Sequence, residues 1–120
     1  MDKANNLDLS IVIPVYNERD NLVPLEEKLE EELSKLELSY EIILVDDGSV
    51  DGSHHIINSI KKHNPRLKLI RFGKNLGQSA AFAAGFKAAS GKIFVTLDAD
   101  LQNNPADIPL LLEKMKDFDV

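Results

Sequence analysis

Two closely spaced carboxylates and an amide near the end of the chain could hold a divalent cation. Asp98 and Asp100 flank a single alanine, and Gln102 adds a neutral oxygen two residues later. Mg²⁺ and Mn²⁺ prefer oxygen ligands and keep waters or substrate phosphates in their shell, so a few protein oxygens and a diphosphate suffice. An Asp-X-Asp pattern also fits a turn or a helix N-cap, and the residues alone leave both interpretations open.

A second pair of carboxylates, Asp46 and Asp47, stands directly before Gly48 and Ser49. Carboxylates at this position can accept hydrogen bonds from the edge of a base or from ribose hydroxyls. The alternative is a turn in which Gly48 supplies a positive φ and Asp51 caps the next helix. Capping explains Asp51 and leaves the preceding pair without a role, so a nucleoside contact and an ordinary turn both remain possible.

An aromatic residue and a glycine-bounded segment could complete a nucleotide site. The ring of Tyr16 could stack on a nucleobase or be an ordinary surface aromatic, with Glu18 close behind it. In the segment 73–77, we expect Lys74, Asn75 and Gly77 near a phosphate, since an ammonium and backbone N–H groups meet there at a helix start. The segment lacks the spacing of a P-loop or a dinucleotide fingerprint, and a simple helix-entry turn fits it equally well.

The polar clusters follow apolar runs that predict strands. These runs are 9–15, 40–45, 67–72 and 92–97. The first, second and fourth are nearly continuous, as in buried strands, whereas the third alternates apolar and charged residues, as in an edge or half-buried strand. Leucine, isoleucine and alanine spacing predicts helices over 21–36, 51–63 and 77–89, and a final helix from near Pro105 or Asp107.

Strands and helices therefore alternate, with short connections between them. This order favours right-handed parallel crossovers and an α/β fold with an open, mostly parallel sheet. Ligands of such sheets bind beyond the carboxyl ends of the strands, where all of the polar clusters lie. By contrast, His54, His55 and His63 fall on a helix away from those ends, and we interpret them as solvated helix residues.

Composition narrows the classes of function. The 120 residues, of which 43% are hydrophobic and 28% charged, match one globular domain, and the net charge of -6 disfavours general binding of nucleic acid. The absence of cysteine excludes a disulfide scaffold and fits the cytoplasm. The polar N-terminus lacks a signal peptide pattern, and no apolar run approaches the roughly 20 residues that span a bilayer.

Taken together, the motifs resemble those of family 2 glycosyltransferases of the GT-A fold, and most closely dolichyl- or polyprenyl-phosphate sugar transferases. The resemblance covers residues 9–117 and is carried by the segments 13–18 (IPVYNE), 45–52 (VDDGSVDG), 75–77 (NLG) and 98–105 (DADLQNNP). A dinucleotide-dependent oxidoreductase is disfavoured, because the first strand is not followed by a G-X-G-X-X-G fingerprint.

The resemblance implies a metal-dependent, inverting transfer of a hexose from a UDP- or GDP-sugar to a polyprenyl or dolichyl phosphate. It makes Asp98 and Asp100 catalytic and assigns Mg²⁺ or Mn²⁺ to Asp100 and Gln102. The nucleotide contacts that it implies are Pro14, Tyr16, Glu18, Asp46, Asp47 and Asp98. The alternatives are transfer to a glycan hydroxyl and a nucleotide-binding module without catalysis.

Members of this family continue beyond the length of this chain. Residues 1–120 are therefore expected to form the nucleotide-sugar-binding part, with the acceptor part and any membrane association supplied by the absent part. The full-length enzyme would then act in the cytoplasm, at the cytoplasmic face of the membrane. A sheet cut at this point leaves an unpaired edge and apolar surface, which predicts self-association of the chain.

Overall fold

A computed structural model describes residues 7–99 of the protein. The helix expected from near Pro105 or Asp107 lies outside the described residues. No helix among residues 7–99 is both long enough and apolar enough to cross a membrane.

The centre of the structure is a four-stranded parallel sheet, with strand order β3-β2-β1-β4. The strands are β1 (Leu9–Val15), β2 (Tyr40–Asp46), β3 (Leu67–Arg71) and β4 (Ile93–Thr96). The expected open α/β sheet is thus confirmed. Leu9 pairs with Tyr40 and Val15 with Asp46, so β1 and β2 end at the same level and bring their following loops together.

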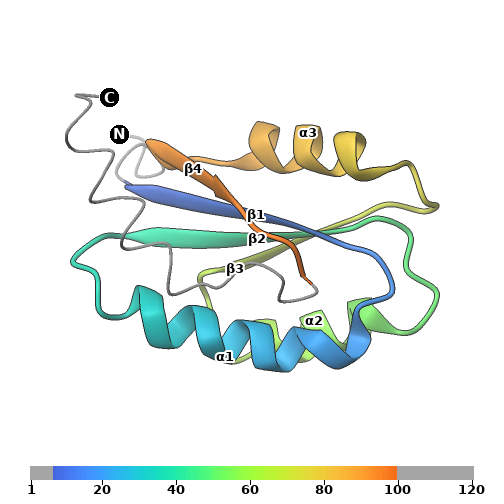
Figure 1. Ribbon diagram of the computed structural model, residues 1–120, viewed down its shortest axis with the longest axis horizontal. Helices are drawn as coiled ribbons and strands as arrows, with labels where there is room; N and C mark the ends of the chain where they lie inside the picture. The colour runs from blue at the N-terminus through green and yellow to red at the C-terminus, as the bar shows by residue number, and fades with distance from the viewer. Residues whose placement is uncertain (1–6, 100–120) are drawn as a thin grey trace.

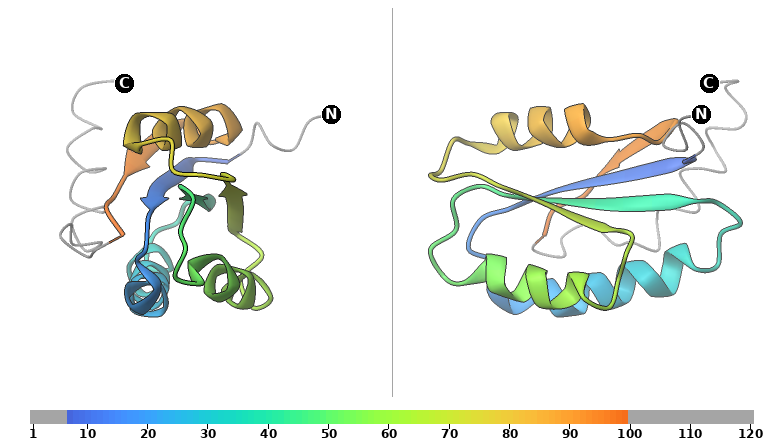
Figure 2. Two further views of the ribbon diagram at one scale, coloured as in Figure 1. Left: turned by 90° about the vertical axis from the view of Figure 1, so that its right-hand side faces the viewer. Right: turned by 180° about the vertical axis from the view of Figure 1, so that it is seen from behind.

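Helices cover both faces of this sheet. The helices α1 (Leu22–Leu33) and α2 (Ser53–Lys61) lie on one face, and α3 (Gln78–Ala88) lies on the other (Figures 1 and 2). A short 3-10 helix, η2 (Arg19–Asn21), leads into α1. The layering explains the nearly continuous apolar runs of β1 and β2, because a strand covered on both faces buries every side chain.

Alternate residues of β1 enter two separate cores. Leu9, Ile11 and Ile13 pack with α1 and α2, whereas Val12 packs with α3. On that second face, Gly85 lets α3 approach the sheet, since a Cβ at this position would collide with the side chain of Val12. The small residues of α3 therefore allow close packing against β1 and β2.

Each helix is shorter than the spacing of apolar residues predicts. The first ends at Leu33 rather than at residue 36, although Leu36 and Leu38 still pack against the core from the following turn. The second begins at Ser53 rather than at 51, because Gly52 adopts a left-handed conformation with φ of 86°. The spacing of apolar residues indicates which residues are buried. Because buried residues continue beyond the helix ends, this spacing predicts helices that are too long.

Strand β4 is an edge of the described sheet, which corrects the expectation of a buried strand. It pairs with β1, and Phe94 is 48% exposed. The ring of Phe94 stacks on Phe86 with 5.8 Å between centroids, and Phe86 stacks on Phe82 at 6.0 Å. An apolar aromatic row therefore lies beside the β4 edge, while β3, the other edge, has the half-buried pattern that was expected.

The β4 edge and its aromatic row predict reversible self-association of the chain. In sedimentation equilibrium, the average mass is expected to rise with concentration, because strand pairing and aromatic burial both favour a second copy. Phe94→Lys is expected to shift the equilibrium toward monomer, and Val50→Lys, at an exposed apolar residue in a loop, is the control. A constant monomer mass at high concentration would contradict the prediction.

Candidate functional site

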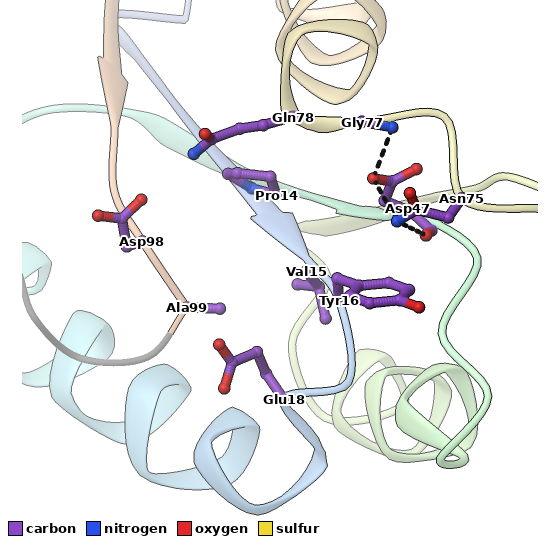
Figure 3. A pocket seen from close by; sticks show the side chains of 10 residues that line it. All are labelled: Pro14, Val15, Tyr16, Glu18, Asp47, Asn75, Gly77, Gln78, Asp98 and Ala99. Carbon is purple, nitrogen blue, oxygen red and sulfur yellow. Dashed lines mark hydrogen bonds between the residues drawn. The ribbon is translucent and has the colours of Figure 1, made fainter.

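A pocket of about 460 Å³ opens at the carboxyl edge of the sheet (Figure 3). It receives residues from the ends of β1, β2 and β4 and from the loop that precedes α3. The lining consists of Pro14, Val15, Tyr16, Glu18, Asp47, Asn75, Gly77, Gln78, Asp98 and Ala99. The pocket therefore lies where parallel α/β sheets bind their ligands.

Most of the residues singled out from the sequence meet in this pocket. The lining includes Pro14, Tyr16, Glu18, Asp47, Asn75, Gly77 and Asp98. Asp46 and Lys74 are not among the lining residues. Asp100 and Gln102 lie outside the described residues.

Asp47 fastens the end of β2 to the loop before α3. Its carboxylate accepts hydrogen bonds from the N–H groups of Leu76, at 2.6 Å, and Gly77, at 3.0 Å. The side-chain amide of Asn75 donates to the same carboxylate at 3.0 Å and to the Asp47 carbonyl oxygen at 3.2 Å. Asp47 as a whole residue is 4% exposed and lines the pocket. It therefore both holds the loop in place and forms part of the pocket wall.

Gly48 allows the same two segments to touch through their backbones. Its φ is 75°, which favours glycine, and a Cβ here would overlap Lys74 and the backbone nitrogen of Asn75. The positive φ expected at Gly48 is thus confirmed. The contact leaves no room for a side chain between the turn after β2 and the loop after β3.

Asp46 differs from its neighbour because it is fully buried. One of its carboxylate oxygens accepts a hydrogen bond from the N–H of Ser49 at 3.0 Å. The other oxygen, Oδ2, has no hydrogen-bond partner among residues 7–99. The structure therefore places Asp46 beneath the turn rather than in the wall of the pocket.

His54 lies closer to the strand ends than the sequence indicates. Burial lowers the pKa of His54, as do the nearby Arg71 and His55, while Asp46 acts in the opposite direction. Its side chain is half-buried, and its Nδ1 atom has no hydrogen-bond partner within the described part of the chain. The expectation of a solvated helix residue away from the strand ends is therefore wrong for His54, whereas His55 and His63 are exposed.

The turn after β1 is tied to the turn after β2, and this tie positions Tyr16 and Glu18. Asn17 has a φ of 53°, its N–H donates to Ser49 Oγ at 2.9 Å, and its Oδ1 accepts from the Val50 N–H at 2.9 Å. Asp51 extends the tie by accepting from the N–H groups of Arg19 and Ser53. The N-cap of α2 is Gly52 rather than the expected Asp51, although Asp51 accepts a hydrogen bond from the N–H of Ser53, the first residue of the helix.

The pocket is acidic. Glu18, Asp47 and Asp98 supply carboxylates, and none of its ten lining residues is lysine or arginine. Carboxylates accept hydrogen bonds from base N–H groups and ribose hydroxyls, but they repel a diphosphate unless a cation stands between them.

Oxygen donors of this kind fit Mg²⁺ or Mn²⁺ rather than a softer metal. Residues 7–99 contain no cluster of three candidate metal-ligating side chains. Asp98 is therefore the described member of the oxygen-rich motif that continues through Asp100 and Gln102.

Three lining residues were missed by the sequence analysis: Val15, Gln78 and Ala99. Val15 and Ala99 adjoin residues that were identified, and their apolar side chains carried no chemical signal. Gln78 had a usable signal, because it directly follows Gly77 and is the first residue of α3. A polar residue at the start of a helix lies at the carboxyl edge of a parallel sheet, where ligands bind, so its position alone made Gln78 a candidate for the site.

The family model for glycosyl transferase family 2 matches residues 10–120. The chain belongs to glycosyl transferase family 2. The match includes all ten residues that line the pocket and all of the sheet except Leu9, so the family assignment and the site concern the same residues.

Two relatives of this family 2 chain are polyprenyl-phosphate sugar transferases. The undecaprenyl-phosphate 4-deoxy-4-formamido-L-arabinose transferase of Aeromonas hydrophila is 44% identical, over 97% of this chain and 37% of the relative. The dodecaprenyl-phosphate galacturonate synthase of Rhizobium johnstonii is 36% identical, over 96% of this chain and 34% of the relative. The chain thus spans about a third of the length of these curated relatives.

Solved structures of glycosyltransferases share the fold. The mannosyltransferase PcManGT from Pyrobaculum calidifontis, in complex with GDP-Man and Mn²⁺, aligns with a TM-score of 0.65 and 26% identity, covering 79% of this chain and 28% of that one. S. aureus TarS aligns with a TM-score of 0.71 and 21% identity, covering 92% of this chain and 33% of that one. The α/β sheet is therefore that of the GT-A glycosyltransferases.

Proposed function

We propose that the pocket at the carboxyl edge of the sheet binds the nucleoside diphosphate part of a sugar donor. The observation that carries this proposal is the convergence of Tyr16, Glu18, Asp47 and Asp98 from separate strand ends on one cavity. An aromatic ring offers a surface for a base, and carboxylates accept hydrogen bonds from base N–H and ribose O–H groups. Tyr16, with 48% of its surface exposed, is available for such stacking.

A divalent cation would complete the donor site. Asp100 and Gln102 would hold Mg²⁺ or Mn²⁺, which when bound neutralises the charge that develops on the departing diphosphate. In support, PcManGT is described with both GDP-Man and Mn²⁺. Asp98 would contribute on the ribose or sugar side, and Pro14 would form part of the wall around the nucleoside.

The reaction we propose for the whole protein is an inverting transfer of a hexose to a polyprenyl phosphate. A phosphate oxygen of the acceptor bonds to the anomeric carbon as the bond from that carbon to the diphosphate breaks, and the electron pair leaves with the nucleoside diphosphate. Because a lipid phosphate is already anionic, no base has to remove a proton. The names of the two relatives support this acceptor class. We further propose that the enzyme meets this lipid at the cytoplasmic face of a membrane.

Calorimetric titration of UDP and GDP, with and without Mn²⁺, tests the donor site. We expect one of them to bind in a Mn²⁺-dependent manner. Asp98→Asn is expected to weaken binding by about tenfold or more, because a hydrogen bond to a charged group contributes about 1.5–3 kcal/mol. Glu27→Gln, which neutralises an exposed carboxylate on α1, is the matched control. The proposal fails if UDP and GDP bind neither to this chain nor to a protein of the relatives' length.

A further inference from the structure

The polar groups of the pocket are unequally divided between acceptors and donors. Glu18, Asp47 and Asp98 provide acceptors, whereas among the ten lining residues only Asn75 and Gln78 carry side-chain N–H groups and only Tyr16 carries a side-chain O–H group. The amide of Asn75 already donates to the carboxylate and the carbonyl oxygen of Asp47. Within residues 7–99, the Gln78 carboxamide is therefore the side-chain N–H donor that the pocket retains for a ligand.

Gln78 is placed to use that donor. It is the first residue of α3, its side chain is exposed, and it makes no side-chain hydrogen bond to another described residue. In the view of Figure 3, its side chain extends from the start of α3 past Pro14 toward the side of the pocket where Asp98 and Ala99 lie. The chain continues from Ala99 into the proposed cation ligands.

We propose that Gln78 is a donor-contacting residue whose carboxamide N–H groups bind a diphosphate oxygen of the nucleotide, an inference that rests on the proposed donor site. A nucleoside diphosphate presents N–H and O–H groups on its base and ribose, which suit the carboxylates. Its phosphate oxygens only accept hydrogen bonds, so they require N–H or O–H donors or a cation. A neutral carboxamide supplies the hydrogen bond without repelling a divalent cation bound beside it, as a lysine would.

Asp47 positions Gln78 for this contact. The hydrogen bond from the Gly77 N–H to Asp47, at 3.0 Å, fixes the residue immediately before Gln78, and Leu76 is held in the same way. Gly77 itself has a φ of 102°, which sets the direction in which α3 begins. The start of α3 is therefore anchored to the end of β2, and the Gln78 side chain leaves from a fixed backbone.

Two substitutions of Gln78 separate a diphosphate contact from other roles. Gln78→Ala removes the carboxamide, and Gln78→Glu keeps its shape while replacing the N–H donors with a negative charge. A carboxylate in the first turn of a helix is favourable, so the second variant is expected to fold at least as stably as the parent chain. Ser79→Ala, an exposed polar residue on the same turn that does not line the pocket, is the matched control.

The test compares UDP with uridine, or GDP with guanosine, at saturating Mn²⁺, in titrations of the 120-residue chain followed by NMR. We expect Gln78→Ala to raise the Kd of the diphosphate by about tenfold, the effect of one hydrogen bond to a charged acceptor. We expect Gln78→Glu to raise it by more than about tenfold. The Kd of the nucleoside is expected to change by less than about twofold, since it carries no phosphate.

Two outcomes would overturn the assignment of Gln78. In one, both variants bind the diphosphate as the parent chain does. In the other, the affinities for nucleoside and diphosphate fall together, which would place the side chain at the base or the ribose. Failure of the parent chain to bind any of the four probes would instead count against the proposed donor site, so the two failures are distinguishable. The thermal unfolding midpoint of each variant confirms that it is folded.

Discussion

Gly48→Ala is expected to lower the free energy of unfolding by about 4 kcal/mol and to remove nucleotide binding. Two separate costs combine at this position. The φ of 75° disfavours any residue with a Cβ, and the added carbon would overlap the backbone of Lys74 and Asn75. The loop that carries Gly77 and Gln78 would have to move away from the turn after β2, and the hydrogen bonds from that loop to Asp47 would be lost.

Gly52→Ala separates these two costs. Gly52 also has a positive φ, 86°, but a Cβ there would meet only the Arg19 side chain, at 3.9 Å. Gly52→Ala, the control, should therefore lower the free energy of unfolding by about 1 kcal/mol from backbone strain alone and retain nucleotide binding. Urea denaturation gives the two free energies, and titration with the nucleotide that the parent chain binds gives the affinities. Equal destabilisation by both substitutions would show that the close contact at Gly48 is not significant.

The sheet could be predicted from the sequence because its signal is local. A run such as 40–45 is apolar on both faces, and that pattern has few explanations other than a strand covered by helices on both sides. The edge position of β4 could not be predicted in this way. Its run is as apolar as that of a central strand, and its exposure depends on which strands pair with it, which is a property of the whole sheet.

The site could be predicted in outline, because the carboxyl ends of parallel strands meet at one edge. Which member of a pair faces the pocket could not be predicted. Asp46 and Asp47 are adjacent and chemically identical, yet one is sealed beneath a turn while the other forms part of the wall. Their different roles depend on a loop about thirty residues further along, whose N–H groups reach only Asp47. A contact of that range leaves no trace in the local sequence.

A buried carboxylate lies at the end of the sheet opposite the pocket, and its replacement is expected to destabilise the fold strongly. Glu41, on β2, is 2% exposed and accepts hydrogen bonds from Ser10 Oγ at 2.6 Å and from the Ser90 N–H at 2.7 Å. Lys68, on β3, approaches it to 2.6 Å in an ion pair. Ser10 Oγ in turn accepts from the Gly91 N–H at 2.8 Å, so one carboxylate joins three strands to the segment that leads into β4.

Glu41→Gln is expected to lower the free energy of unfolding by about 3 kcal/mol at pH 7, because the amide cannot replace a carboxylate that accepts hydrogen bonds on one oxygen and pairs with the Lys68 ammonium through the other. Glu31→Gln is the control. Glu31 forms an exposed ion pair with Lys28 at 4.0 Å, and its neutralisation should cost less than about 0.5 kcal/mol. Urea denaturation measures both values. Similar costs for the two variants would show that the buried network adds no more than a surface pair.

The pH dependence of stability provides an independent test of the same network. Burial by itself would raise the pKa of Glu41, but the hydrogen bonds from Lys68, Ser10 and Ser90 together hold it below its ordinary value of 4.5. A carboxylate with a lowered pKa in the folded state stabilises the protein above the pKa of the unfolded chain. That contribution disappears as the pH falls through the folded pKa, because the folded carboxylate then takes up its proton as well.

The stability gap between the parent chain and Glu41→Gln should therefore narrow as the pH is lowered from about 6 to about 3. Glutamine does not titrate, so the variant lacks this part of the pH dependence, whereas every other carboxylate remains in both proteins. A gap that stays constant over this range would mean that the charge on Glu41 is not what the network stabilises. In that case, the cost of the substitution would have to come from the geometry of the amide rather than from the lost carboxylate.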